Sequence, residues 1–110
     1  MTRYELLKFK AFAIVAQGTI KCAVPCCSVR ALAMLHLDHK NNDGCKHRKK
    51  HGKAGGVHCY RWAVNNPRLA RKRLQILCAN HDRMKQRLGS IDAIIAVEQQ
   101  YDNEAANKRD

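Results

Sequence analysis

The residues of this chain best suited to chemistry lie in the segment HLDHKNNDG, residues 36–44, and centre on the adjacent pair Asp38 and His39. A carboxylate such as Asp38 can hold a hard divalent cation, Mg²⁺ or Mn²⁺, and an imidazole such as His39 can take a proton from water. Asp82, in the downstream segment RLQILCANHDRMK, can complete the cation site from the first turn of a helix. A cation held there would neutralise a scissile phosphate while His39 generates the nucleophile. The three residues together suit a hydrolytic metal site; an adjacent Asp–His pair alone more often belongs to a turn.

Cysteine and histidine form a second candidate site. Cys22 with either Cys26 or Cys27 supplies one close pair, and Cys78-x-x-His81 supplies the other. Zinc takes four tetrahedral nitrogen or sulfur ligands, and small domains gain stability when two close pairs from distant segments share one ion. The spacing predicts a structural Zn²⁺ site and leaves the choice between Cys26 and Cys27 open.

The six cysteines also allow other interpretations. Thiols are common in protein cores, and Cys45 and Cys59 lie near histidines that would suit a separate metal cluster, namely His47, His51 and His58. Disulfides need an oxidising compartment, and the N-terminal MTRYELLKFKAFAIVAQG has the features of neither a signal peptide nor a membrane span. We expect a cytoplasmic protein, not bound to a membrane, whose clustered cysteines hold metal.

The charge of the chain is strongly positive and unevenly spread. Lysine and arginine number 21 against 9 acidic residues, a formal net charge of +12, and the basic residues crowd between Lys40 and Arg87. Such a field attracts phosphate backbones, so DNA is the expected partner; a face tuned only for solubility is the alternative. The candidate nucleic-acid contacts are His47, Lys49, Lys50, Arg61, Arg71, Lys72, Arg73, Arg83 and Lys85.

The elements that position these residues are short. In the N-terminal half, the spacing of apolar residues and the positions of turn residues predict the helices and strands. The composition of residues 31–37 would also suit a helix. The predicted order is a helix over 2–17 stopped by Gly18, a strand over 19–21, a strand over 31–37 ending at Asp38 and His39, and a basic loop over 40–57.

The C-terminal half has clearer boundary signals. Proline suits the first position of a helix, serine the N-cap and glycine the residue after the last turn. The predicted order is a helix over 58–64, a helix opened by Pro67, a strand over 76–77 ending at Cys78, a helix over 79–88 stopped by Gly89, and a helix over 91–106 capped by Ser90. In the last helix, the residues expected to face inward are Ile91, Ile94, Ile95, Val97 and Tyr101. At 110 residues the chain is one domain, with an N-terminal helix over 1–18, a core over 19–89, and a C-terminal helix with a frayed tail over 90–110.

The segments LHLDHKNNDG-x-x-HRK, YRW and RLQILCANHDRMK together resemble the HNH nucleases, especially the small phage-type, homing-endonuclease-like proteins, over roughly residues 19–88. The resemblance implies an α+β fold with a ββα-metal core: two strands and a helix around one catalytic divalent cation, stapled by a separate zinc and flanked here by the terminal helices. It implies Asp38 as metal ligand and His39 as general base. It also puts Arg48 beside the substrate phosphate as a catalytic residue, with His47 supporting the metal or the phosphate.

Three positions depart from the family pattern. Asp82 stands where the closing metal ligand is usually His or Asn, and His81 stands where a second zinc cysteine is usual. Both substitutions keep a suitable ligand atom. Arg73 stands near the central Asn of the family name, so another group would have to orient His39. The departures keep open a second hypothesis, a zinc-stapled DNA-binding module without catalysis; a disulfide-bonded cationic peptide acting on membranes is a third.

Overall fold

The centre of the fold is an antiparallel pair of strands, β1 (Leu35–His39) and β2 (Leu74–Cys78). The computed structural model describes residues 1–25, 27–42 and 56–107; Gly56 and Asn107 are described by their backbone alone. In the register of the sheet, Leu35 lies opposite Cys78 and Asp38 lies opposite Gln75. Since side chains alternate along a strand, residues 36 and 38 point to one face, and residues 35, 37 and 39 point to the other.

Helix α5 (Ala79–Leu88) follows β2 without a loop and packs on both strands. Cys78 is its N-cap, and Gly89 ends it with a left-handed φ of 95°, where a residue without a Cβ is favoured. The two strands and α5 therefore form the centre of a small mixed α+β fold, which confirms the predicted fold class in its coarse form.

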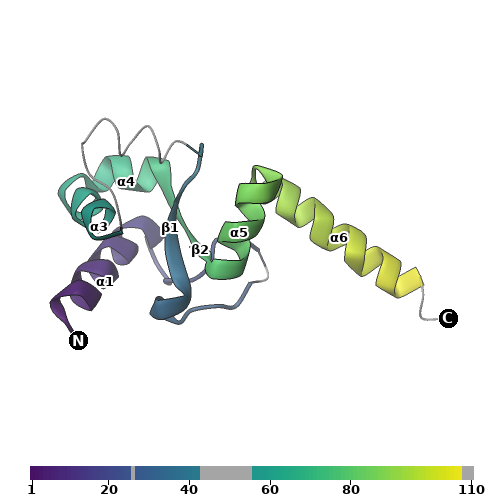
Figure 1. The fold of residues 1–110 in the computed structure, drawn as a ribbon, viewed down its shortest axis with the longest axis horizontal. Helices are drawn as coiled ribbons and strands as arrows, with labels where there is room; N and C mark the ends of the chain where they lie inside the picture. Colours follow the sequence, from purple (N-terminus) through teal and green to yellow (C-terminus); the bar gives the residue numbers. More distant parts are fainter. Residues whose placement is uncertain (26, 43–55, 108–110) are drawn as a thin grey trace.

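Three helices cover the opposite side of the sheet (Figure 1). They are α1 (Arg3–Ala16), α3 (Gly56–Asn65) and α4 (Pro67–Arg73). Helix α1 packs on α3, α4 and β2, and the largest fully buried apolar side chains are Phe12, Leu35, Leu74, Leu77 and Ile94. Pro67 begins α4, as predicted from its fixed φ and missing N–H.

The N-terminal predictions hold for the helix and fail for details around it. Gln17, with φ 51°, takes the left-handed position that the sequence assigned to Gly18. The helix buries Ala11, Phe12 and Val15 and leaves Leu6 and Phe9, two of its apolar residues, 44% and 45% exposed. The strand predicted over 19–21 is not formed, since the chain there bends toward β2 and pairs only through Ala23 N–H, which donates to Ile76 O.

The segment before Asp38 also differs from its prediction. Residues 32–34 form one turn of 3₁₀ helix, η1 (Leu32–Met34), and the strand begins only at Leu35. Asp38 and His39 consequently lie within β1 and not beyond its end. The pairing with β2 continues through Lys40 N–H, which donates to Arg73 O, so the acid–imidazole pair is held by backbone hydrogen bonds.

The last helix, α6 (Ile91–Asn107), begins as predicted after Ser90, whose Oγ accepts a hydrogen bond from Ala93 N–H. Ile94 is fully buried, but Tyr101, expected to face inward, is 69% exposed. The reason is visible in Figure 1: α6 packs at its start against α5 and then extends beyond the rest of the chain. Among the helices described, none combines the length and apolar character that crossing a membrane requires.

Candidate metal centre

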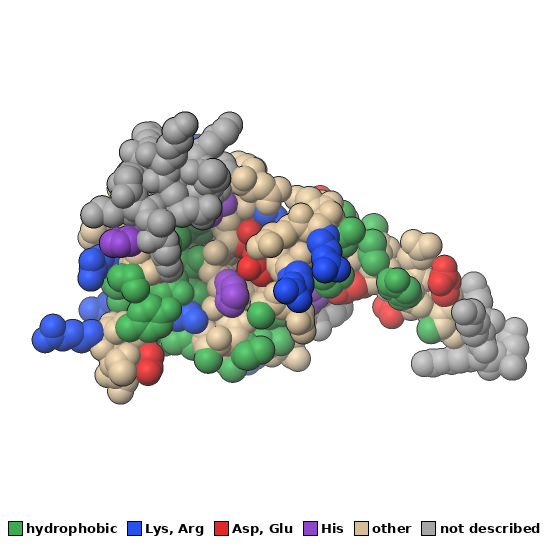
Figure 2. Space-filling model, in the orientation of Figure 1, with side chains coloured by type: hydrophobic (Ala, Val, Ile, Leu, Met, Phe, Trp, Pro, Cys, Tyr) green, Lys and Arg blue, Asp and Glu red, His purple; other side chains and the backbone are tan. Residues whose placement is uncertain are grey.

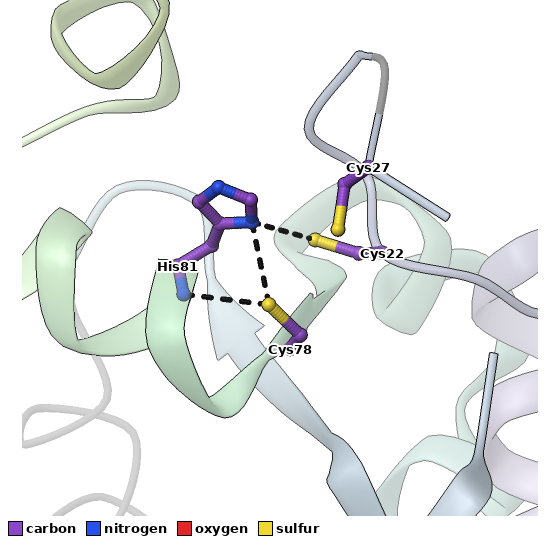
Figure 3. Close-up of side chains that lie close together, drawn as sticks. All are labelled: Cys22, Cys27, Cys78 and His81. Atoms are coloured by element: carbon purple, nitrogen blue, oxygen red, sulfur yellow. Dashed lines mark hydrogen bonds between the residues drawn. The ribbon is translucent and has the colours of Figure 1, made fainter. Parts of the chain in front are cut away.

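Three thiols and one imidazole converge at the junction of β2 and α5 (Figure 3). Cys22 and Cys27 come from the segment after α1, Cys78 ends β2, and His81 lies in the first turn of α5. Their ligand atoms all lie within 4.8 Å of one another. His81 Nδ1 is 3.4 Å from Cys22 Sγ and 3.3 Å from Cys78 Sγ. These are the four residues that the sequence predicts as zinc ligands; Cys26, the alternative to Cys27, lies outside the described residues.

The local backbone explains how the thiols meet. Cys22 N–H donates to Val29 O and Cys27 N–H donates to Val24 O, and these two hydrogen bonds bring Cys22 and Cys27 close together. His81 N–H donates to Cys78 Sγ at 3.5 Å, so the same thiol caps α5 and faces the cluster. Each pair is therefore pre-positioned by hydrogen bonds of its own segment.

The donor set and its spacing fit Zn²⁺. Tetrahedral zinc with sulfur at about 2.3 Å and nitrogen at about 2.0 Å separates the two ligand atoms by roughly 3.5 Å, close to the distances found here. Burial raises the pKa of Cys22 to about 11, so without a cation this thiol keeps its proton. Burial also acts to raise the pKa of Cys27, but hydrogen bonds from the Val29 backbone, Cys22 and His81 outweigh it and lower that pKa. In the part of the chain that the structure describes, this is the one group of three or more such ligands.

Glu98 of α6 contacts the cluster, although the sequence did not predict it as a site residue. Its Oε1 lies 2.8 Å from His81 Nε2, on the side of the ring away from the thiols. A carboxylate on the outer nitrogen of a metal-binding histidine fixes the tautomer and makes the inner nitrogen a better ligand. No motif could have found this contact, because it depends on where α6 packs against α5.

We expect the substitution Glu98→Ala to weaken zinc binding about 10- to 100-fold, because His81 would lose the group that orients it. The affinity can be measured by competition with a chromogenic chelator. Asp102→Ala is the matched control, since Asp102 lies one turn further along α6 and is exposed. Equal affinities for the two variants would show that Glu98 does not support the metal.

The face of β1 that α5 covers carries the other predicted site. Asp38 Oδ2 lies 2.9 Å from Lys85 Nζ and accepts a hydrogen bond from Gln75 Nε2 at 2.8 Å. The Lys85 ammonium also donates to His39 O at 2.9 Å and to Asn42 Oδ1. The side chains of Lys85 and Asp38 are only 2% and 12% exposed, so the pair is shielded from water. An internal cation is thus surrounded by the kind of oxygen atoms that a hard metal ion prefers.

Asp82 contacts a different partner. Its Oδ2 lies 3.3 Å from His36 Nδ1, two residues before Asp38 on the same face of β1. Residues two apart lie on the same face of a strand, and residues three apart lie on the same face of a helix. The pairs His36–Asp82 and Asp38–Lys85 are therefore two successive contacts between β1 and α5. The structure brings Asp38 and Asp82 to one face but gives each its own partner. His39 is the last residue of β1 and, by the alternation of side chains along the strand, belongs to the other face.

We expect Lys85→Met to destabilise the fold by about 3–5 kcal/mol, because it would leave the shielded Asp38 carboxylate without its counter-charge. Urea denaturation followed by circular dichroism measures this. Lys10→Met, which removes an exposed lysine of α1, should change stability by about 0.5 kcal/mol or less. Adding Asp38→Asn to Lys85→Met should recover part of the loss, and a Lys85→Met variant as stable as the wild type would contradict the assignment.

The predicted nucleic-acid contacts fall into three groups. Arg61, Arg71, Lys72 and Arg83 are exposed, and Arg73 is half-buried. The prediction that Lys85 contacts nucleic acid is wrong, because its amine is buried in the contacts just described and does not offer a surface charge. The remaining predicted residues lie outside the described ranges, namely His47, Arg48, Lys49 and Lys50, and so do Cys45 and His51. On the face shown in Figure 2, lysine and arginine side chains gather over α5.

Comparisons of the chain with models of protein families, with curated proteins and with solved structures found no match.

Proposed function

We propose that this protein is a metal-dependent DNA endonuclease of the HNH type, which hydrolyses phosphodiester bonds with a water activated by His39. The observation that carries the proposal is the order of the core: β1 ends in Asp38 and His39, β2 pairs with it, and α5 follows at once with Asp82 in its first turn. In this proposal Asp38 and Asp82 hold Mg²⁺ or Mn²⁺, and the zinc cluster fixes the junction from which α5 starts.

In the proposed hydrolysis, the divalent cation and His39 have separate roles. The divalent cation would stabilise the charge on the phosphate and on the leaving oxygen. His39 would take the proton of the attacking water, a role that suits an imidazole near neutral pH. Because Lys85 Nζ lies against Asp38 Oδ2, a cation at Asp38 has to share this carboxylate with the ammonium or displace it. Among the described residues, Asp82 is paired with the His36 ring and not with a lysine, so it is the easier ligand to recruit.

DNA binding would come mainly from the phosphate backbone. The net charge of +12 and the exposed arginines and lysines of α3, α4 and α5 support this. Phosphate contacts release counterions, so the affinity should fall steeply as salt rises and should depend little on sequence.

The ion pair between Asp38 and Lys85 favours a second candidate, a zinc-stapled DNA-binding module without catalysis. A carboxylate already neutralised at 2.9 Å by a buried ammonium has less to gain from a metal ion. In this candidate Lys85 is a permanent substitute for the divalent cation, while α5 contributes His81 to the zinc cluster and presents its exposed basic side chains.

A plasmid-nicking assay separates the two candidates. The zinc-loaded full chain is incubated with supercoiled DNA, with and without added Mg²⁺ or Mn²⁺, while DNA binding is followed in parallel at several salt concentrations. The nuclease should convert the plasmid to open-circular or linear form only when the second metal is added. Salt-sensitive DNA binding with no plasmid conversion at any metal concentration would contradict the nuclease proposal and support the binding module.

A further inference from the structure

A cavity of about 340 Å³ lies beside the sheet, and the cluster residue Cys22 is among the residues that line it. It is bounded by the end of α1, the segment 19–23, the end of α4 and the start of β2. Leu74 and Ile76 give it an apolar wall, while Gln17, Thr19 and Gln75 add polar side chains. Its size lies at the lower end of the range for small-ligand pockets, about 300–1,000 Å³.

Three cationic side chains line this cavity: Lys21, Lys40 and Arg71. No aspartate or glutamate is among the lining residues, and in the described part of the chain none of the three cations forms an ion pair. The positive charge of the cavity is therefore not neutralised from within.

The three cations are instead oriented by backbone carbonyls. Lys40 Nζ donates to Arg71 O at 3.1 Å, and Arg71 Nε donates to Ile14 O at 3.2 Å, at the end of α1. Lys21 Nζ donates to Cys22 O at 3.5 Å. A carbonyl positions the cation without cancelling its charge, and each side chain keeps further N–H donors for a ligand. Such a pre-positioned, uncompensated set is what an anion requires.

We propose that this cavity binds a phosphate of a nucleic-acid strand together with part of the nucleotide that carries it. The lysines and Arg71 would hold the phosphate oxygens, with the sugar or base against Leu74 and Ile76. Lys40 directly follows His39, and Gln75 both lines the cavity and donates to Asp38. A strand held here would therefore run beside the end of β1. Its placement next to the reaction centre rests on the proposed nuclease, but the binding itself does not.

The test measures binding without any catalytic metal. Zinc-loaded ¹⁵N-labelled protein is titrated with the trinucleotide d(TTT) and, separately, with inorganic phosphate, and amide shifts are followed by NMR. We expect d(TTT) to shift the amides of residues 17–23 and 74–76 and to bind at least about 10-fold more tightly than phosphate, since it adds contacts with the apolar wall. Lys21→Gln and Lys40→Gln should each weaken d(TTT) about 5-fold or more, because each removes a charge-assisted hydrogen bond.

Lys10→Gln is the matched control, because Lys10 is exposed on α1 and does not line the cavity. It should change the affinity less than about 2-fold if the effect is local. An equal loss in Lys10→Gln would show a diffuse charge effect, and phosphate binding as tightly as d(TTT) would show a site for a free anion; either result overturns the proposal. Melting temperatures of the variants exclude unfolding as the cause. Failure of plasmid nicking with intact d(TTT) binding would overturn the nuclease and leave this cavity site standing.

Discussion

Removing the metal from the Cys22, Cys27, Cys78 and His81 cluster is expected to lower the melting temperature by roughly 20 °C or more. Zinc binding in small domains contributes about 10–16 kcal/mol, which equals or exceeds the whole stability of a typical domain, about 5–15 kcal/mol. Even a loss of about 5 kcal/mol gives a shift of this size in a chain of about 100 residues. The cluster joins the segment after α1 to the start of α5, so loss of the metal should release these two segments from each other.

The experiment compares zinc content and thermal unfolding of the wild type, of the wild type treated with a chelator, and of Cys78→Ser. Cys59→Ser is the control, because Cys59 lies in α3 outside the cluster and its loss should cost about 1 kcal/mol or less. We expect one zinc per chain in the wild type and in Cys59→Ser, and none in Cys78→Ser. If Cys78→Ser melts with the wild type, the four residues do not form a structural metal site.

Replacing His39 by alanine is expected to reduce plasmid nicking about 100-fold or more, while DNA binding and the melting temperature change little. Loss of a general base typically costs a factor of about 10²–10⁴. The hydrogen bond that Lys85 donates to His39 uses the backbone carbonyl, which alanine keeps, so this link between β1 and α5 should remain.

His58→Ala is the matched control, since it removes an imidazole from the first turn of α3 and not from the sheet. Added imidazole should restore part of the activity of His39→Ala, a rescue that a merely structural role would not give. Undiminished nicking by His39→Ala would remove this residue as the base, and a search would then begin with His36, the other imidazole of β1.

Several local features of the fold could be predicted because they depend on neighbouring residues alone. Pro67 at the first position of α4, Gly89 after α5 and Ser90 before α6 act through their own backbone geometry or a hydrogen bond within one turn. The pairing of Cys78 with His81 is likewise local, since both lie at one helix start. The strand predicted over 19–21 is wrong because the chain after α1 turns toward β2, where Ala23 N–H donates to Ile76 O, a contact between distant segments.

The sequence by itself predicted Cys22, Cys78 and His81 as members of one candidate metal cluster, together with the α+β character and the net positive charge. It could do so because ligand spacing, turn residues and charge can be read along the chain. Only the tertiary structure decided which partners the chemical groups have. Asp38 meets Lys85, Asp82 meets His36, and His81 meets Glu98, contacts that join residues 17 to 47 positions apart. The physical reason is that a charge is neutralised by whatever packing brings near it. The electrostatic surroundings of Asp38 are therefore determined by α5 and its buried Lys85, which the adjacency of Asp38 and His39 in the sequence does not reveal.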